Sequence, residues 1–144
     1  MKVLLDTNVI SELRRPGAHP GIRAMLGKVR EEDQFVSVVS LGEISYGVAV
    51  LPAGKRRDEL QEWLGLTARY FSDRVLTIDG DIAMLWGEIA AKGRRAGRVI
   101  SVQDGLIAAT ALHYGLHVMT RNVSDFDTTG VLVINPWDEN PDEV

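Results

Sequence analysis

Four acidic residues of this chain have the residue types and positions to act together on a metal ion. They are Asp6, Glu43, Asp104 and Asp125. Clustered carboxylates repel one another unless a cation lies among them. Because the chain contains no cysteine, thiolate metal sites are excluded and oxygen ligands are favoured. Mg²⁺ and Mn²⁺ take oxygen ligands and usually keep several waters, so these residues could support a divalent-metal site.

The elements that must position these acids alternate between strands and helices. Short apolar runs predict strands over 3–5, 35–39, 74–78, 117–120 and 131–134. Apolar residues at helical spacing predict helices over 9–13, 22–29, 41–51, 60–71, 79–93 and 101–115, with a short turn or helix over 122–126. This order, without tight hairpin signals, predicts an α/β fold. Its central, mostly parallel sheet of about five strands would carry helices on both faces.

The expected fold brings the acids to one edge of the sheet. Asp6 ends the first strand, and the other three acids lie near the start of helical segments. In open α/β sheets, ligands bind outside the carboxyl ends of the strands. We therefore expect the four carboxylates to converge on one crevice.

Helix capping is an alternative role for three of the acids. Each stands three residues after a capping-type residue: Glu43 after Ser40, Asp104 after Ser101, and Asp125 after Asn122. Such caps contribute on the order of 1 kcal/mol each, and the spacing alone leaves both roles open. Capping does not account for Asp6, because a carboxylate at the end of a buried strand needs a partner.

Other catalytic signatures are weak or absent. The chain has no G-x-G-x-x-G or Walker-type loop, so dinucleotide or nucleoside triphosphate binding lacks its usual motif. An aspartyl phosphatase needs a second acid two positions after its nucleophile, but Asn8 follows Asp6 there. His113 and His117 are spaced like metal ligands, but Gly115 ends the helix between them, so we expect surface or strand-end roles.

Composition and charge set limits on the class of protein. The hydrophobic fraction of 45% and the charged fraction of 25% are typical of a folded globular domain. The net charge of −4 equals the contribution of four acids near the C-terminus, Asp138, Glu139, Asp142 and Glu143. The rest of the chain is balanced, so net charge decides nothing about the substrate. No segment has the length of a membrane span or the apolar stretch of a signal peptide, and we expect a cytoplasmic protein.

Local groups of basic and aromatic residues remain to be placed. Arg94, Arg95 and Arg98 surround the end of an expected helix and could contact a phosphate backbone, although a solvated turn is the simpler interpretation. Trp63 and Trp86 lie on apolar stripes, which favours the core or a subunit interface over substrate stacking.

With these acids in view, the chain resembles the PIN-domain ribonucleases, specifically the VapC and FitB-like toxins of bacterial type II toxin–antitoxin pairs. The segments that carry the resemblance are 3–16, 40–48, 51–57, 104–111, 120–126 and 135–137, and the match runs nearly end to end. The resemblance implies a three-layer PIN-like fold and a single PIN domain over 1–137. The acidic tail over 138–144 is expected to fray.

The resemblance also implies a site and an activity. The family's acidic metal site falls on Asp6, Glu43, Asp104 and Asp125, which would be both catalytic residues and ligands of Mg²⁺ or Mn²⁺. The polar residues expected to support them are Thr7, Asn8, Thr120 and Asn122. The activity would be metal-dependent endoribonuclease cleavage of RNA phosphodiesters, leaving 5′-phosphate and 3′-hydroxyl ends. The resemblance leaves two questions open: whether one or two ions bind, and whether Asp125 or Asn122 is the fourth ligand.

The resemblance implies partners as well. Such toxins act as homodimers and are blocked by a cognate antitoxin. They contact operator DNA only through that antitoxin. We expect the antitoxin to insert an Arg or Lys among the four acids, because a guanidinium donates two parallel hydrogen bonds to a carboxylate. The alternative function is a non-catalytic PIN-like module that binds protein or nucleic acid. The retained set of four mutually repelling acids argues against that alternative.

Overall fold

The computed structural model describes residues 1–139, and its five strands form one parallel sheet. The strands are β1 (Val3–Leu5), β2 (Gln34–Ser37), β3 (Val75–Leu76), β4 (His117–Met119) and β5 (Val133–Ile134). Their order in the sheet is β3-β2-β1-β4-β5, and every neighbouring pair is parallel. The predicted α/β class and the parallel sheet of five strands are confirmed.

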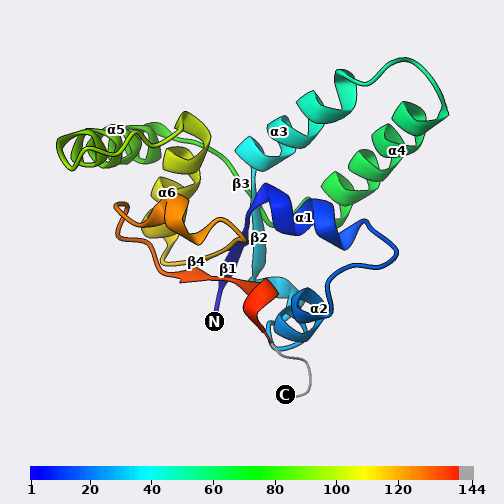
Figure 1. The fold of residues 1–144 in the computed structure, drawn as a ribbon, viewed down its shortest axis with the longest axis horizontal. Helices are drawn as coiled ribbons and strands as arrows, with labels where there is room; N and C mark the ends of the chain where they lie inside the picture. Colours follow the sequence, from blue (N-terminus) through cyan, green and yellow to red (C-terminus); the bar gives the residue numbers. More distant parts are fainter. Residues whose placement is uncertain (140–144) are drawn as a thin grey trace.

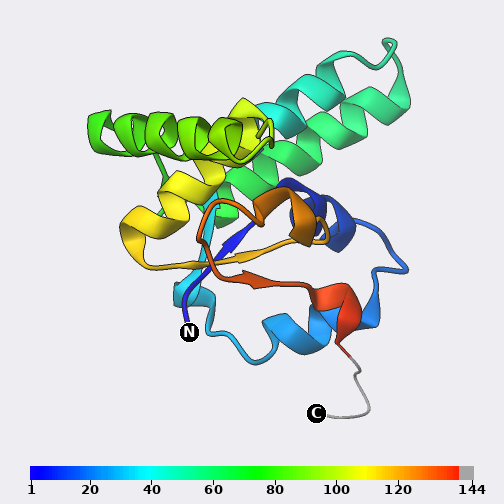
Figure 2. The ribbon, with the colours of Figure 1, turned by 60° about the vertical axis from the view of Figure 1, so that its left-hand side comes forward.

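The helices cover both faces of this sheet (Figures 1 and 2). They are α1 (Thr7–Leu13), α2 (Pro20–Leu26), α3 (Val38–Ala49), α4 (Lys55–Tyr70), α5 (Gly80–Arg95) and α6 (Val102–Tyr114), with short 3₁₀ turns η1 (Glu31–Asp33), η2 (Val123–Phe126) and η3 (Pro136–Asp138). Among residues 1–139, no helix is long and apolar enough to cross a membrane.

The central strand β1 separates two apolar cores. Successive side chains of a strand point to opposite faces. Val3 and Leu5 accordingly pack into one cluster with residues of α1 to α4, whereas Leu4 packs into a second cluster with residues of α5 and α6. All three side chains are fully buried, which explains why this strand reads as a continuous apolar run.

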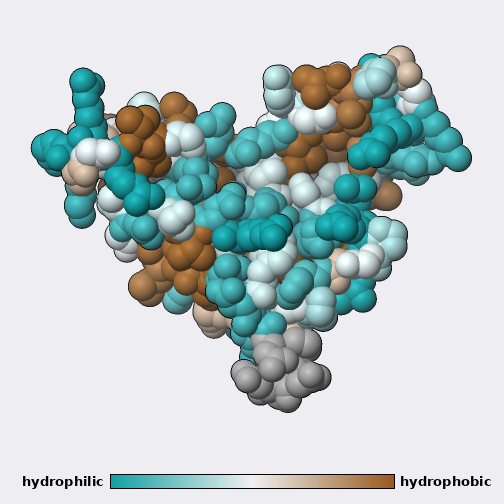
Figure 3. Space-filling view, viewed as in Figure 1, coloured by the Kyte–Doolittle hydropathy of each residue, from teal (hydrophilic) through white to brown (hydrophobic). Residues whose placement is uncertain are grey.

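The carboxyl ends of the strands open into a notch. Figure 3 shows the molecule hollowed between the part built by α5 and α6 and the part built by α3 and α4, with hydrophilic residues along the floor. The register pairs Leu5 with Met119, and the backbone N–H of Asp6 donates to the Met119 carbonyl at 3.0 Å. The first residues beyond β1 and β4 are therefore neighbours at this edge.

Several element boundaries differ from those expected from the sequence, and the largest shift is that of α4, which begins at Lys55 instead of residue 60. The helix after β2 begins three residues earlier, because the Ser37 hydroxyl accepts a hydrogen bond from the Val39 N–H at 3.0 Å and caps it. The helix α5 continues through Arg95. Arg94 and Arg95 therefore lie in its last turn, and the helix end expected at 93 was wrong by two residues.

Part of the expected C-terminal tail packs on the domain. Asp138 closes η3, and the Glu139 carboxylate pairs with the Lys28 ammonium. The remaining residues of the predicted frayed tail, 140–144, lie outside the described residues.

A glycine in the first turn of α6 fixes how closely α5 approaches it. A Cβ at Gly105 would lie 2.7 Å from Cδ1 of Trp86, a side chain of α5 that packs against the second core cluster. This contact holds the turn that also carries Asp104. Trp86 thus belongs to the core, as its apolar stripe predicted.

We expect Gly105→Ala to lower the free energy of unfolding by about 1–3 kcal/mol, because the added methyl would overlap the Trp86 ring. Gly65→Ala on α4 is the matched control, since a Cβ there meets open space. It should stabilise the protein by about 0.5–1 kcal/mol, the usual effect of replacing a helical glycine. Urea denaturation of both variants tests this, and equal stabilisation by the two substitutions would contradict it.

Candidate metal centre

Asp6 is the most constrained of the four predicted acids. It follows a fully buried strand, is itself only 5% exposed, and caps α1. Its Oδ1 accepts from the Thr7 N–H at 2.8 Å, and its Oδ2 accepts from the Thr120 hydroxyl at 2.8 Å and from the Asn8 amide at 3.4 Å. These donors fix both carboxylate oxygens in a buried position.

The hydrogen bonds around Asp6 join the ends of β1 and β4. The Asn8 amide also donates to Thr120 Oγ1 at 3.1 Å, and Asn8 Oδ1 accepts from the Arg121 N–H at 3.2 Å. Thr120 Oγ1 further accepts from the Asn122 N–H at 3.0 Å. Thr120, Asn8 and the Thr7 backbone therefore lie where the resemblance placed supporting groups, whereas Asn122 contributes through its backbone.

Glu43 reaches the site from the second turn of α3. The predicted capping role for the pair Ser40 and Glu43 is wrong, because Ser37 caps this helix. Ser40 is fully buried inside the helix instead, and its hydroxyl has no hydrogen-bond partner among residues 1–139. A carboxylate with no capping role, half-buried beside other acids, needs a different explanation.

Asp104 reaches the site from the start of α6. Ser101 caps this helix, and its hydroxyl accepts from the Asp104 N–H at 3.1 Å, as its spacing predicted. The bond engages the backbone of Asp104 and leaves its half-buried carboxylate available.

Asp125 lies on the exposed turn η2. Asn122 precedes this turn without a capping hydrogen bond from its side chain. Arg98 donates to the Ser124 carbonyl and lies 3.4 Å from the Asp127 carboxylate, so its guanidinium holds the turn on both sides of Asp125. Arg98, expected to contact RNA, is thus engaged within the molecule, whereas Arg94 and Arg95 are exposed on α5.

The carboxylates influence one another's protonation. Burial raises the pKa of the Asp6 carboxyl, hydrogen bonds from Thr120 and Thr7 lower it in part, and the charge of Asp125 raises it further. Burial also raises the pKa of Asp104, with a contribution from the charges of Asp6 and Asp125. Asp6, Asp104 and Asp125 therefore lie close enough for their charges to act on one another.

Glu43 shares this electrostatic environment. Burial raises the pKa of its carboxyl first, and the charges of Asp6 and Asp104 add to the increase. The neighbouring Thr7 hydroxyl lowers the pKa of Glu43 in part. Thr7 Oγ1 is buried and has no partner within hydrogen-bonding distance and angle among residues 1–139. An unpartnered buried hydroxyl beside a carboxylate leaves a polar position for a further ligand.

The donor set fits a water-rich divalent site. Within the described part of the chain, no three acidic or imidazole side chains lie close enough to hold one ion directly. Mg²⁺ is commonly bound through one or two carboxylates and keeps several waters. Asp6, Glu43, Asp104 and Asp125 supply carboxylate oxygens of the kind that such an ion takes.

Comparisons with known proteins identify the family of this chain. The family model described as PIN domain matches residues 3–131. The VapC ribonuclease Y4jK of Sinorhizobium fredii is 37% identical over 94% of this chain and 98% of its own length. Toxin FitB of Neisseria gonorrhoeae is 38% identical over the same shares of the two chains. The solved structure of FitAB bound to an IR36 DNA fragment superposes with a TM-score of 0.87 at 35% identity, covering 96% of this chain and 97% of that chain.

Without divalent metal, we expect the free energy of unfolding to fall as pH rises from the ordinary carboxyl range through the raised pKa values of Asp6, Glu43 and Asp104. In that window the native state keeps protons that the unfolded chain has released, so raising the pH favours unfolding. Mn²⁺ should reverse the loss, because it binds the charged carboxylates of the native state. Urea denaturation between about pH 5 and pH 8, in EDTA and in Mn²⁺, measures both effects.

The variant Asp104→Asn should flatten this pH dependence in EDTA and weaken stabilisation by Mn²⁺. Glu88→Gln is the control, because Glu88 is exposed on α5 outside the acidic cluster. It should retain the pH dependence of the parent protein. A metal-free stability that rises across the same window would contradict the electrostatic account.

Proposed function

Because this chain belongs to the PIN-domain family, with VapC and FitB toxins as full-length relatives, we propose that it is the ribonuclease of a toxin–antitoxin pair and requires Mg²⁺ or Mn²⁺. The observation that carries the metal requirement is the acidic cluster at the edge of the sheet. Burial raises the pKa of Asp6, Glu43 and Asp104, and the charge of at least one neighbouring acid raises each pKa further. A cation removes that repulsion.

The chemistry follows from the residues that line the edge. When bound, the divalent ion lowers the pKa of a coordinated water and offsets charge on the leaving oxygen of a phosphodiester. Asp6 would hold it with both carboxylate oxygens already oriented by Thr120, Asn8 and the Thr7 backbone. Asp104 would hold it from the opposite side of the notch. Because the nucleophile is water, cleavage does not require the RNA 2′-hydroxyl, and the products carry 5′-phosphate and 3′-hydroxyl ends.

The rival function is a PIN-like module that binds nucleic acid or protein without cleaving it. Such a module gains nothing from a set of mutually repelling carboxylates that lowers its stability. The donors around Asp6 would also be unnecessary for binding alone. We therefore favour the enzyme, with Asp125 as the fourth acid.

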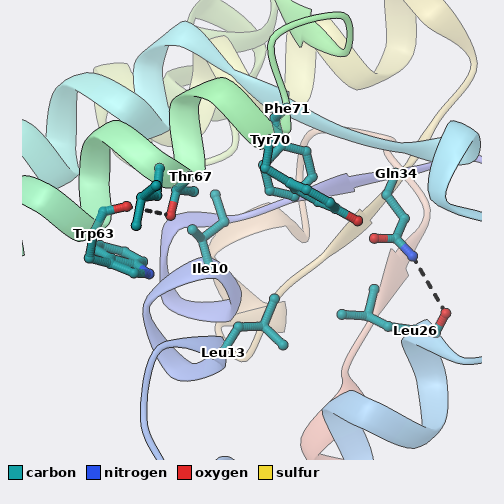
Figure 4. Close-up of a pocket in the computed structure, with 9 residues that line it drawn as sticks. Ile10, Leu13, Leu26, Gln34, Trp63, Thr67, Tyr70 and Phe71 are labelled. Atoms are coloured by element: carbon teal, nitrogen blue, oxygen red, sulfur yellow. Dashed lines mark hydrogen bonds between the residues drawn. The ribbon is translucent and has the colours of Figure 1, made fainter.

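The antitoxin is expected to act on two adjoining features. The acidic cluster would accept an inserted Arg or Lys. Close to it, an apolar groove of about 420 Å³ runs between α1 and α4, where Ile10, Leu13 and Trp63 contribute side chains (Figure 4). Ile10 lies one helical turn from Thr7, so one segment could fill both. Apolar contacts would supply affinity, because charge pairing alone is offset by desolvation.

The remaining assignments are consistent with this role. The FitAB relative was solved bound to DNA, which supports contact with operator DNA through the antitoxin. A homodimer would cover Tyr46 on α3 and Val50 at the C-cap of this helix, which are 73% and 59% exposed. Hydrophobic surface over this region is visible in Figure 3. We further propose a single domain over 1–137, a cytoplasmic location, and phosphate contacts by Arg94 and Arg95.

We expect Asp104→Asn to reduce RNA cleavage by at least about a hundredfold, because losing one ligand removes much of the stabilisation that the metal gives the transition state. Glu88→Gln should keep full activity. Sequencing of the RNA ends should find new 5′-phosphate ends after incubation with the parent protein and none after incubation with Asp104→Asn. Full activity in a purified, folded Asp104→Asn protein would contradict the assignment.

We also expect the cognate antitoxin and divalent metal to compete. Raising the Mn²⁺ concentration should weaken the complex, because both cations need the same carboxylates. Replacing the inserted Arg or Lys of the antitoxin by Ala should relieve inhibition more than it weakens binding. Titration calorimetry across a wide Mn²⁺ range tests this, and an unchanged affinity would mean that inhibition works away from the acids.

A further inference from the structure

Arg121 is held as a fixed cation beside the acidic cluster. Its side chain is exposed, and its guanidinium lies over the ring of Trp137 at 5.3 Å from the centroid. Its backbone N–H donates to Asn8 Oδ1, and the Asn8 amide donates to Asp6. One chain of hydrogen bonds therefore sets the position of Arg121 relative to the acid that is most firmly held.

Arg14 is held in the same manner on the other side. Its guanidinium lies over the ring of Trp63 at 5.9 Å from the centroid. Arg14 lines a groove of about 270 Å³ to which Thr7, Glu43 and Arg56 also contribute. One continuous hollow thus leads from an acid of the cluster to two exposed arginines.

The strand order places the two stacked arginines on opposite sides of Asp6. Arg121 follows β4, and its aromatic partner follows β5. Arg14 ends α1, and its groove is shared with α3, which follows β2. Because β1 lies between β2 and β4, the acid that ends β1 stands between the two arginines.

Stacking fixes a guanidinium without using its hydrogen bonds. The aromatic ring contacts the flat face, so the N–H donors in the plane remain free for an anion such as a phosphate. Neither arginine forms an ion pair within residues 1–139. Both cations are thus oriented in advance at small cost in side-chain entropy.

From this geometry we propose that Arg14 and Arg121 bind phosphates of the RNA backbone on the two sides of the cleaved bond. The proposal rests on the ribonuclease function proposed above and names the residues that hold its substrate. Arg14 lies about 10 Å along α1 from Thr7, which places its phosphate beyond the one at the acids. Two positive anchors also offset the repulsion between an anionic strand and an acidic site.

An RNA strand suits these positions better than a protein segment. The groove that would anchor the antitoxin has no charged residue in its lining. The Arg14 groove is also lined by apolar side chains such as Ile44, but it carries Arg14, Arg56 and the Glu43 carboxylate. An antitoxin segment that inserts a cation among the acids and continues into this groove would be repelled by Arg14 and Arg56 wherever it carries further positive charge. A chain of phosphates meets attraction at both.

RNA binding at increasing salt tests the proposal. A labelled single-stranded RNA is titrated with Asp104→Asn protein, which suppresses cleavage, and with the same protein carrying Arg14→Gln or Arg121→Gln. Each substitution should weaken binding about tenfold, because a charge-assisted hydrogen bond is lost. Each should also reduce the slope of log affinity against log salt by about 0.7, the value for one phosphate contact on a single strand.

Two further variants separate contact from general charge. Arg69→Gln removes the same charge from the last turn of α4, which leads to the amino end of β3, and should leave the slope unchanged. Trp137→Leu keeps Arg121 but removes the ring on which it stacks. This variant should weaken RNA binding and keep the slope of log affinity against log salt. In the parent protein, Arg14→Gln and Arg121→Gln should leave thermal stabilisation by Mn²⁺ unchanged.

The outcomes distinguish the two proposals. If the RNA binds and both arginine variants keep the affinity and slope of their background, the phosphate anchors are refuted and the ribonuclease function stands. If the parent protein neither binds nor cleaves RNA, both proposals are refuted. If Arg14→Gln weakens only the antitoxin complex, the groove belongs to the antitoxin and the proposal is wrong for Arg14.

Discussion

The carboxylate of Asp6 is the constraint on which the rest of the site depends. It stands at the end of a strand whose three residues are completely buried, so water cannot supply its hydrogen bonds. The protein supplies them from the first turn of α1 and from Thr120 at the end of β4. The register of β1 against β4, the start of α1 and the position of Arg121 all follow from satisfying this one group.

Satisfying Asp6 does not remove the electrostatic cost of the site. Glu43 and Asp104 approach it from helices on opposite faces of the sheet, and each is partly withdrawn from water. Nothing in the packing of the two cores requires these charges. The arrangement opposes folding, which is the usual sign that stability has been given up for function.

The sequence identified the acids more securely than the elements that carry them. A charge directly after Val3, Leu4 and Leu5 is informative in any context, and so is a serine three residues before Asp104. For Glu43 the sequence favoured Ser40 as the capping serine, whereas Ser37 caps the helix; both serines are fully buried, and local sequence cannot say which of them caps. Arg98 and Arg121 were harder still: their contacts reach Ser124 and Trp137, and such pairings depend on how the whole sheet closes.

The hydrogen bond between Asp6 and Thr120 joins residues 114 positions apart. Asp104 and Asp125 also lie in the last third of the chain. During synthesis, therefore, the N-terminal half emerges from the ribosome with Asp6 and Glu43 but without Thr120, the long-range donor to Asp6. The catalytic edge comes into being only when β4 pairs beside β1, near the end of translation. A chain that ends before β4 would therefore carry the Asp6 carboxylate without the hydroxyl that orients it.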